Sequence, residues 1–214
     1  MENKREPQAG ETIKQLPGIE AGTIVLASKS PRRAEILRTV GLPFEIAAAD
    51  IDESRTPNEA PHLYVERLAR EKAEAVAVSF QTGRLVLGAD TIVVAGGGEI
   101  LGKPRDEADA RRMLRLLSNG WHDVLTGVAI VRAQSETGEQ QPALIAHEKT
   151  RVRFAQMSEA EINWYVASDE PFDKAGAYGV QGRAALFIEE IQGDYWNVVG
   201  LPVRLLYKLL ARVV

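Results

Sequence analysis

The chain has 214 residues, of which 45% are hydrophobic and 26% are charged, within the range of an ordinary soluble globular protein. Its 26 basic and 30 acidic side chains give a net charge of −4, which argues against a protein that mainly coats nucleic acid or anionic membrane. Cysteine is absent, which excludes disulfides, thiolate metal sites and cysteine nucleophiles. The three histidines are scattered along the chain, so we expect any catalysis to use carboxylates, lysine or a bound metal.

Residues 1–21 show no hydrophobic periodicity, and we predict that they form a flexible leader. They contain no apolar core of the signal-peptide type, and no later run approaches the ~18 apolar residues of a membrane span. We therefore expect a cytoplasmic protein with one folded domain, residues 22–214.

The compact apolar run at residues 23–27 predicts a buried strand, and a helix is expected from Pro31 to just before Gly41. A second helix should begin near Pro61. Lys72 interrupts its apolar face, so this lysine is expected to point inward or at a cleft. The segment "RLVLGADTIVVAGGGEIL" then predicts two strands joined by glycines.

The second half of the chain predicts a helix capped by Asp106, two strands at residues 124–131 and 143–154, and a helix that opens with a capping box at Ser158. Pro171 is expected to end that helix. A strand at residues 184–191 and a helix beginning at Pro202 complete the pattern. Strands and helices mix irregularly, which favours an α/β or α+β fold around one long mixed sheet.

The first candidate site lies in "LASKSPRRAEIL", where the predicted strand meets the predicted helix. Ser28 and Ser30 place hydroxyls beside free backbone N–H groups, and Ser30 also suits the N-cap position of the helix. Arg32 and Arg33 lie in the first helical turn, where the helix dipole disfavours positive charge by ~0.3–1 kcal/mol. The pair indicates a bound anion such as phosphate.

The second candidate is "GADTIVV", in which Asp90 interrupts an otherwise apolar strand. A buried carboxylate is costly unless it is paired, so Asp90 is either in a salt bridge or functional. A functional Asp90 would bind a divalent cation or accept a proton from water. Glu53, Lys72 and Lys103 add a second carboxylate and two cations, which suits a magnesium-bound triphosphate, although Glu53 and Lys103 are individually typical of solvated surface residues.

The third candidate is the glycine-rich stretch "FDKAGAYGVQGRAALF", which presents Tyr178 and Gln181. The amide of Gln181 can donate and accept at once, as recognition of uracil or thymine requires, although a loop amide is more often a turn or solvent contact. The residues alone thus indicate an enzyme-like domain with a phosphate site and leave the substrate open.

At these residues the sequence resembles the Maf family of nucleoside triphosphate pyrophosphatases. The matching blocks run from about Thr23 to the C-terminus, in the family's order: "LASKSPRRAEIL", "LAREKA", "GADTIVV", "ILGKP", "GWHDVLTGVAI" and "DKAGAYGVQGRAALFIEEIQGDYWNVVGLP". Several blocks in one order are far more specific than a lone glycine motif.

The resemblance implies an α/β fold with a long mixed twisted sheet, flanking helices and two lobes around a cleft, similar to inosine triphosphate pyrophosphatases. It also implies a cytoplasmic homodimer that cleaves nucleoside triphosphates to monophosphate and pyrophosphate with a divalent cation. The family's catalytic aspartate falls on Asp90, as proton acceptor. Its specificity positions fall on Arg32, Thr91 and Gln181, which match the branch that prefers dTTP and UTP.

We therefore predict water attack at the α-phosphorus of dTTP or UTP, with modified pyrimidine nucleotides as further candidates. Asp90 is expected to act as base or as metal ligand, and Glu53 to share the binding of Mg²⁺ or Mn²⁺. The expected substrate contacts are Ser28, Ser30, Arg32, Arg33, Lys72, Thr91, Lys103 and Gln181. Two alternatives are a pyrophosphatase for 7-methyl-GTP and a nucleotide-sensing regulator of cell division; neither nucleic acid nor membrane is expected as a partner.

Overall fold

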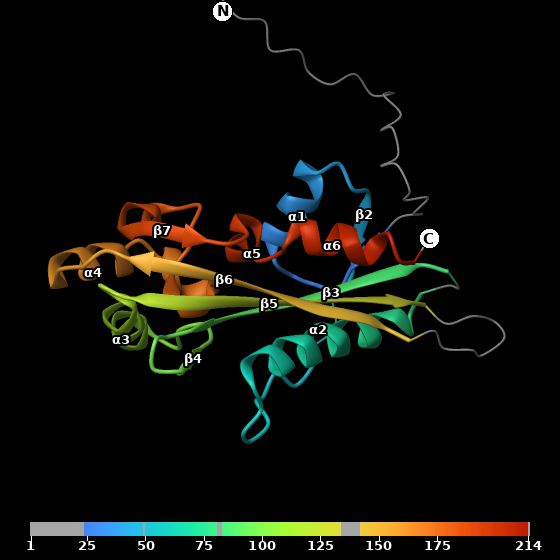
Figure 1. The fold of residues 1–214 in the computed structure, drawn as a ribbon, viewed down its shortest axis with the longest axis horizontal. Helices are drawn as coiled ribbons and strands as arrows, with labels where there is room; N and C mark the ends of the chain where they lie inside the picture. The colour runs from blue at the N-terminus through green and yellow to red at the C-terminus, as the bar shows by residue number, and fades with distance from the viewer. Residues whose placement is uncertain (1–23, 49, 81–82, 134–141, 214) are drawn as a thin grey trace, which may run out of the picture.

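The structure is a computed structural model that describes residues 24–48, 50–80, 83–133 and 142–213 (Figure 1). The leader predicted at residues 1–21 lies outside the described residues. In the part of the chain that is described, no helix is long and apolar enough to cross a membrane.

A mixed sheet runs through the length of the molecule (Figure 1). Its described strands follow the order β2-β1-β3-β5-β6-β7, with β4 paired to β3. β1 is parallel to β2 and β3, and the other pairs are antiparallel. The strands are β1 (Ile24–Leu26), β2 (Phe44–Ile46), β3 (Leu85–Val94), β4 (Ile100–Leu101), β5 (Trp121–Arg132), β6 (Leu144–Phe154) and β7 (Ile188–Gln192). The long mixed sheet predicted from the sequence is confirmed.

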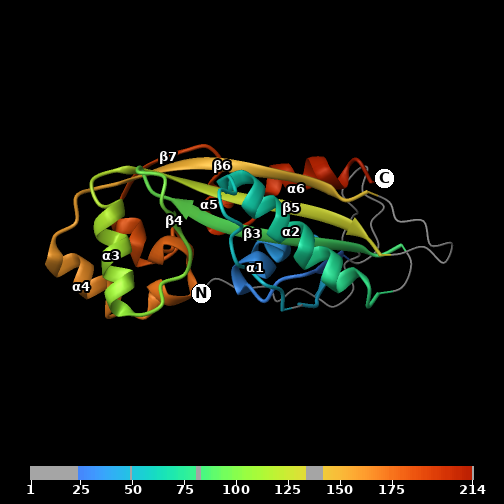
Figure 2. The ribbon, with the colours of Figure 1, turned by 90° about the horizontal axis from the view of Figure 1, so that it is seen from below.

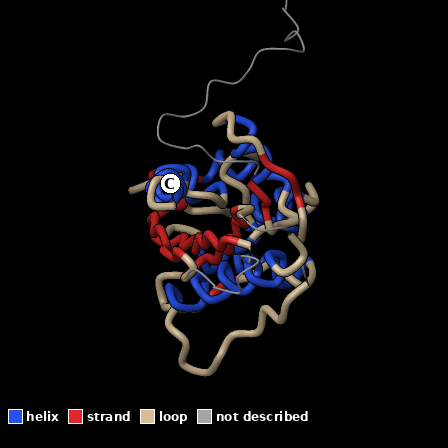
Figure 3. The backbone as a smooth tube through the Cα atoms, turned by 90° about the vertical axis from the view of Figure 1, so that its right-hand side faces the viewer, coloured by secondary structure: helices blue, strands red, loops and turns tan. Residues whose placement is uncertain are grey.

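Helices cover both faces of this sheet, as the end-on view in Figure 3 shows. In Figure 1, α2 lies below the sheet, and α1 and α6 lie above it. Figure 2 shows α3 and α4 together at the left end of the molecule. The helices are α1 (Pro31–Thr39), α2 (Pro61–Ala77), α3 (Glu107–Leu117), α4 (Glu159–Val166), α5 (Tyr195–Val199) and α6 (Val203–Leu210). The chain thus forms two lobes, one around α3 and α4 and one around α1, α2 and α6.

Two glycines let α2 lie directly against the sheet. A Cβ atom added at Gly88 of β3 would lie 2.0 Å from the carbonyl oxygen of Ala69, and one at Gly127 of β5 would lie 2.2 Å from that of Val65. Since no side chain fits in these spaces, α2 keeps this position only over glycine.

One edge of β3 is unpaired along its middle. β5 pairs with β3 throughout on one edge, whereas on the other edge β1 pairs with Val86 and Leu87 and β4 with Val93 and Val94. Residues 88–92 therefore have no described strand beside them on that edge. Asp90 and Thr91 lie in this gap between the two lobes.

Two sequence predictions are wrong in detail. Residues 184–191 do not form one strand: Arg183–Phe187 is a 3₁₀ helix, η3, and only β7 is extended. Ala184 and Phe187 are buried while Leu186 is 74% exposed, the three-residue spacing of a 3₁₀ turn rather than the alternation of a strand.

The end of α4 also differs, because α4 stops at Val166 and Pro171 lies in a separate 3₁₀ helix, η1 (Glu170–Asp173). Asp169 adopts the left-handed conformation (φ 59°) between them. A residue in that conformation cannot continue an α-helix, so the helix ends before the proline.

Candidate active site

A cavity of about 1040 Å³ opens at the unpaired edge of β3. The turn between β1 and α1, the loop before α2, and α2 itself form part of its wall, and the segment from Glu170 to Gly182 forms much of the rest. Every predicted site residue lines this cavity: Ser28, Ser30, Arg32, Arg33, Glu53, Lys72, Asp90, Thr91, Lys103 and Gln181. The cleft that the family resemblance implied is thus present, and these side chains line it.

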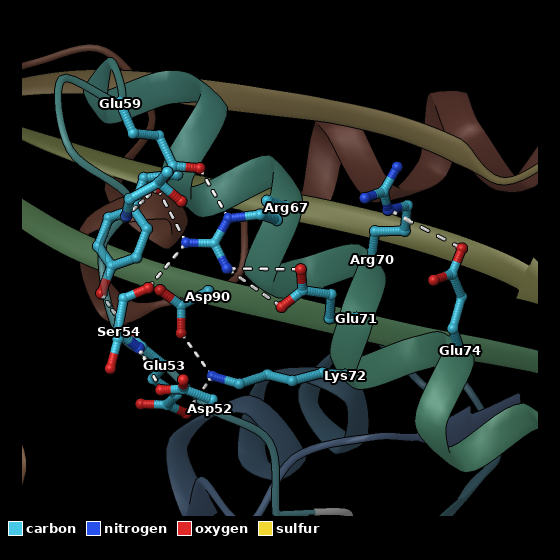
Figure 4. A network of polar contacts seen from close by, with 12 residues as sticks. Asp52, Glu53, Ser54, Glu59, Arg67, Arg70, Glu71, Lys72, Glu74 and Asp90 are labelled. Atoms are coloured by element: carbon cyan, nitrogen blue, oxygen red, sulfur yellow. Dashed lines mark hydrogen bonds and ion pairs between the residues drawn. The ribbon is translucent and has the colours of Figure 1, made fainter.

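Asp90 and Glu53 share Lys72 (Figure 4). The Lys72 ammonium nitrogen lies 2.6 Å from Asp90 Oδ1 and 2.7 Å from Glu53 Oε1. Asp90 is therefore paired, and Lys72 points into the cleft as predicted from its place on α2. Partial burial favours a higher pKa for Glu53, but Lys72, Lys103 and Arg33 outweigh it and hold that pKa below its usual value.

Arg33 is buried in the cavity wall and contacts only neutral oxygens. Its Nε donates to the Gly200 carbonyl at 2.9 Å, Nη1 to Ser28 Oγ at 3.0 Å and Nη2 to Thr91 Oγ1 at 3.1 Å. Among the described residues, no carboxylate lies within ion-pair distance of this guanidinium, and burial lowers the pKa of Arg33. A buried cation of this kind favours an anion in the adjoining cavity.

Arg32 binds the opposite wall of the cavity. Its Nη1 lies 2.5 Å from Asp173 Oδ2, and its Nη2 donates to the Asp173 carbonyl at 3.1 Å. Lys174 binds the other carboxylate oxygen of Asp173 at 2.5 Å. Asp173 thus joins the two lobes through α1 and η1.

Three predicted residues have few protein partners. Ser30 occupies the N-cap position of α1, but its side chain makes no capping bond; instead, its backbone N–H donates to Ser28 Oγ at 3.2 Å. Lys103 and Gln181 are exposed at the cavity, and neither forms a hydrogen bond or ion pair with any residue that the structure describes. Their polar ends are therefore available to a ligand.

The sequence did not single out Tyr64 or Asp173, which also line the cavity. Asp173 lies at the start of the glycine-rich stretch "FDKAGAYGVQGRAALF", and its place in that candidate segment is the sequence feature that could have marked it as a site residue. Tyr178, which the sequence did single out, is buried and shares a 2.8 Å hydrogen bond with His122 Nε2. Burial lowers the pKa of His122 to about 4, so its imidazole is neutral near pH 7.

The carboxylates suit a divalent metal only in part. Oxygen ligands are those that Mg²⁺ and Mn²⁺ prefer, and Mg²⁺ usually takes one or two carboxylates together with waters and substrate phosphates. Asp90 and Glu53 meet that requirement, but the described residues contain no group of three or more metal-ligating side chains. The donor set fits a metal that shares its ligands with a bound triphosphate, rather than one enclosed by protein alone.

The fold resembles that of the Staphylococcus aureus Ham1 protein, with a TM-score of 0.52 and 14% identity over 90% of this chain and 100% of that one. A family model described as "Maf-like protein" matches residues 23–213. The chain therefore belongs to the Maf family, as the sequence motifs indicated.

Relatives with high identity are named dTTP/UTP pyrophosphatases. That of Symbiobacterium thermophilum is 53% identical over 88% of this chain and 93% of its own length. The enzyme of Anaeromyxobacter dehalogenans strain 2CP-1 is 53% identical over 90% of this chain and 94% of its own length. The enzyme of Hahella chejuensis is 54% identical over 84% of this chain and 87% of its own length. The branch suggested by the sequence is the one to which these relatives' names refer.

Proposed function

We propose that this chain hydrolyses nucleoside triphosphates, with dTTP and UTP as preferred substrates, to the monophosphate and pyrophosphate. The observation that carries the proposal is the buried guanidinium of Arg33, which contacts only neutral oxygens in the wall of a large cavity. A triphosphate in that cavity would place an anion beside this guanidinium, which forms no ion pair with the described carboxylates. The names of relatives at about half identity support the choice of nucleotide.

In the proposed reaction, the triphosphate tail lies against the cationic wall and a water molecule attacks the α-phosphorus. The new P–O bond forms as the bridging bond to the β-phosphate breaks, and pyrophosphate leaves with the bonding electrons. Lys72 holds Asp90 Oδ1, which leaves Oδ2 to orient the water and receive its proton. The proposed phosphate contacts are Ser28, Ser30, Arg32, Arg33, Lys72 and Lys103.

Asp90 and Glu53 are the residues proposed to hold Mg²⁺ or Mn²⁺. A divalent cation bound there would neutralise phosphate charge as the leaving group departs. Lys72 keeps the two carboxylates together when no cation separates them, because its ammonium contacts both.

Base selection is proposed to depend on Arg32, Thr91 and Gln181. Gln181 offers an exposed amide that can donate to a pyrimidine carbonyl and accept from the ring N–H. The Thr91 hydroxyl already accepts a hydrogen bond from Arg33 and lies 2.9 Å from Thr126 Oγ1. Thr91 is therefore proposed to shape the cavity wall more than to donate a free hydroxyl to the base.

The test is a panel of triphosphates that includes dTTP, UTP, CTP, GTP and 7-methyl-GTP, with Mg²⁺ or Mn²⁺ and identification of both products. We expect monophosphate and pyrophosphate, with the highest kcat/KM for dTTP and UTP. Faster turnover of 7-methyl-GTP would overturn the assignment of dTTP and UTP as preferred substrates. Release of orthophosphate would show attack at the terminal phosphorus and would overturn the proposed attack at the α-phosphorus. Binding without product release under either metal would favour the nucleotide-sensing regulator.

From the family, we also propose a homodimer in the cytoplasm. Analytical ultracentrifugation of the purified chain tests the dimer, and fractionation of cells that express it tests the location.

A further inference from the structure

Glu53 stands on an exposed loop whose own hydrogen bonds join loop residues to one another: Arg55 Nε donates to the Glu59 carbonyl at 3.1 Å, and the Thr56 N–H donates to Glu59 Oε2 at 3.2 Å. Residues 52–58 are all exposed, so no apolar burial fixes their position. Within the loop, the Asp52 carboxylate accepts a bond from the Ser54 N–H at 2.9 Å, which shapes a local turn but does not attach it to the rest of the protein. The position of the Glu53 carboxylate must come from contacts outside the loop.

Helix α2 supplies those contacts. Tyr64 Oη donates to the Glu53 carbonyl at 2.7 Å, and Arg67 Nη2 donates to the next carbonyl, that of Ser54, at 3.0 Å (Figure 4). Two consecutive peptide groups beside the Glu53 side chain are thus held by one face of α2. Lys72, further along the same helix, holds the carboxylate itself.

Arg67 is in turn fixed from three sides. Its Nε and Nη2 bind the two oxygens of Glu59 at 2.7 and 2.9 Å, in the bidentate geometry that a guanidinium favours. Its Nη1 lies 3.2 Å from Glu71 Oε2, and its Cζ lies 5.5 Å from the centre of the Tyr64 ring. Because Glu59 is at the far end of the loop, Arg67 ties both ends of residues 53–59 to α2.

We infer that Arg67 is a positioning residue for the metal site: through the Ser54 carbonyl and Glu59 it holds the loop that presents Glu53, and thereby sets the affinity for the divalent cation. This inference rests on the proposed function, in which Glu53 is a metal ligand. Asp90 belongs to β3 and does not contact Arg67, so the group proposed to activate water keeps its place when Arg67 is replaced.

The experiment compares Arg67→Met with Arg70→Met. Arg70 lies on the same helix and pairs with Glu74 at 3.9 Å, but it has no bond to the loop, so its replacement controls for the loss of one arginine from α2. Binding of Mn²⁺ is measured by electron paramagnetic resonance in the presence of the α,β-methylene analogue of UTP, which cannot be cleaved between its α- and β-phosphates.

We expect Arg67→Met to raise the Kd for Mn²⁺ on the order of 10-fold, as loss of an outer-shell contact does in other metal sites, and Arg70→Met to leave it unchanged. In pyrophosphate release, the Mn²⁺ concentration for half-maximal activity should rise in parallel, while kcat at saturating Mn²⁺ stays within about twofold of the wild type. A lower kcat with an unchanged Mn²⁺ affinity would overturn the inference.

Tyr64→Phe provides a second measurement that does not depend on the folding of Arg67→Met. It keeps the ring that packs on Arg67 and removes only the hydroxyl bonded to the Glu53 carbonyl, so we expect a shift of about threefold in the Kd for Mn²⁺, in the same direction. Wild-type affinity in Tyr64→Phe and in every folded Arg67 variant overturns the inference. A wild-type protein that binds Mn²⁺ yet releases no pyrophosphate overturns the proposed function instead.

Discussion

Arg32 and Asp173 lie 141 positions apart in the chain, yet one guanidinium binds both the carboxylate and the carbonyl of Asp173. Both residues line the cavity, in which the proposed substrate carries several negative charges. Asp173 therefore holds Arg32 in place and at the same time competes with phosphate for it.

The first prediction concerns this competition. In Asp173→Asn, one negative charge leaves the cavity wall, so the KM for dTTP should fall by about two- to fivefold, in line with the ~1 kcal/mol limit for a partly exposed ion pair. Steady-state kinetics measures this effect. Glu189→Gln, which removes an acid that pairs with Arg153 outside the cavity, should leave KM unchanged; a higher KM in Asp173→Asn would mean that holding Arg32 outweighs the competition.

The second prediction separates binding from chemistry. Asp90→Asn keeps the shape of the side chain but removes its ability to take a proton, so pyrophosphate release should fall by about 10³-fold or more. Calorimetric titration with the α,β-methylene analogue of UTP should still show binding within about threefold of the wild type, because cations hold the tail. Near-normal turnover in this variant would rule out Asp90 as the base.

The third prediction concerns stability at mildly acidic pH. Burial holds the pKa of His122 at about 4 in the folded protein, whereas the unfolded chain takes up the proton at its ordinary pKa of about 6.5. The neutral His122 ring therefore makes its full contribution to the free energy of unfolding above about pH 6.5. This contribution is lost as the pH falls toward about 4. Between about pH 7.5 and about pH 5, the free energy of unfolding should drop by about 2 kcal/mol from this group.

Urea denaturation at the two pH values checks that drop. His122→Gln should reduce the pH dependence of the free energy of unfolding. His62→Gln, which replaces an exposed histidine, should retain that dependence. Equal pH dependence in the wild type and in His122→Gln would contradict the assignment to His122.

The fourth prediction uses the close contact between α2 and the sheet. Gly127→Ala would place a methyl group 2.2 Å from the Val65 carbonyl oxygen, so α2 must move and the free energy of unfolding should fall by about 3 kcal/mol. Because Lys72 moves with the helix, pyrophosphate release should fall as well. Gly97→Ala meets no atom within 4 Å and serves as the control; thermal unfolding and product release are measured on both.

Local signals in the sequence found much of the fold. Asp106 accepts a bond from the Asp109 N–H at the start of α3, and Ser158 with Glu161 forms the expected capping box at α4. Such patterns succeed because cap and helix are adjacent in the chain. β2 was not predicted, since three half-exposed or exposed residues show no alternation, and its place in the sheet comes from pairing with β1.

Long-range contacts explain what the sequence could not show at the candidate site. The sequence alone points to Asp90 and Lys72, because each breaks an apolar pattern on its own strand or helix. The different environments of Arg32 and Arg33 depend instead on residues far away in the chain. Buried Arg33 donates to the carbonyl of Gly200, 167 positions away, whereas Arg32 binds Asp173. No local pattern records which of two adjacent arginines turns inward.

The fit of α2 over Gly88 and Gly127 has a practical consequence for engineering. The same helix carries Lys72 at the cavity, so a substitution that improves packing beneath α2 shifts a charged group that contacts both acids. Directed evolution for heat resistance should therefore accumulate tolerated changes around α3 and α4 and avoid α2, where gains in packing and retention of turnover conflict.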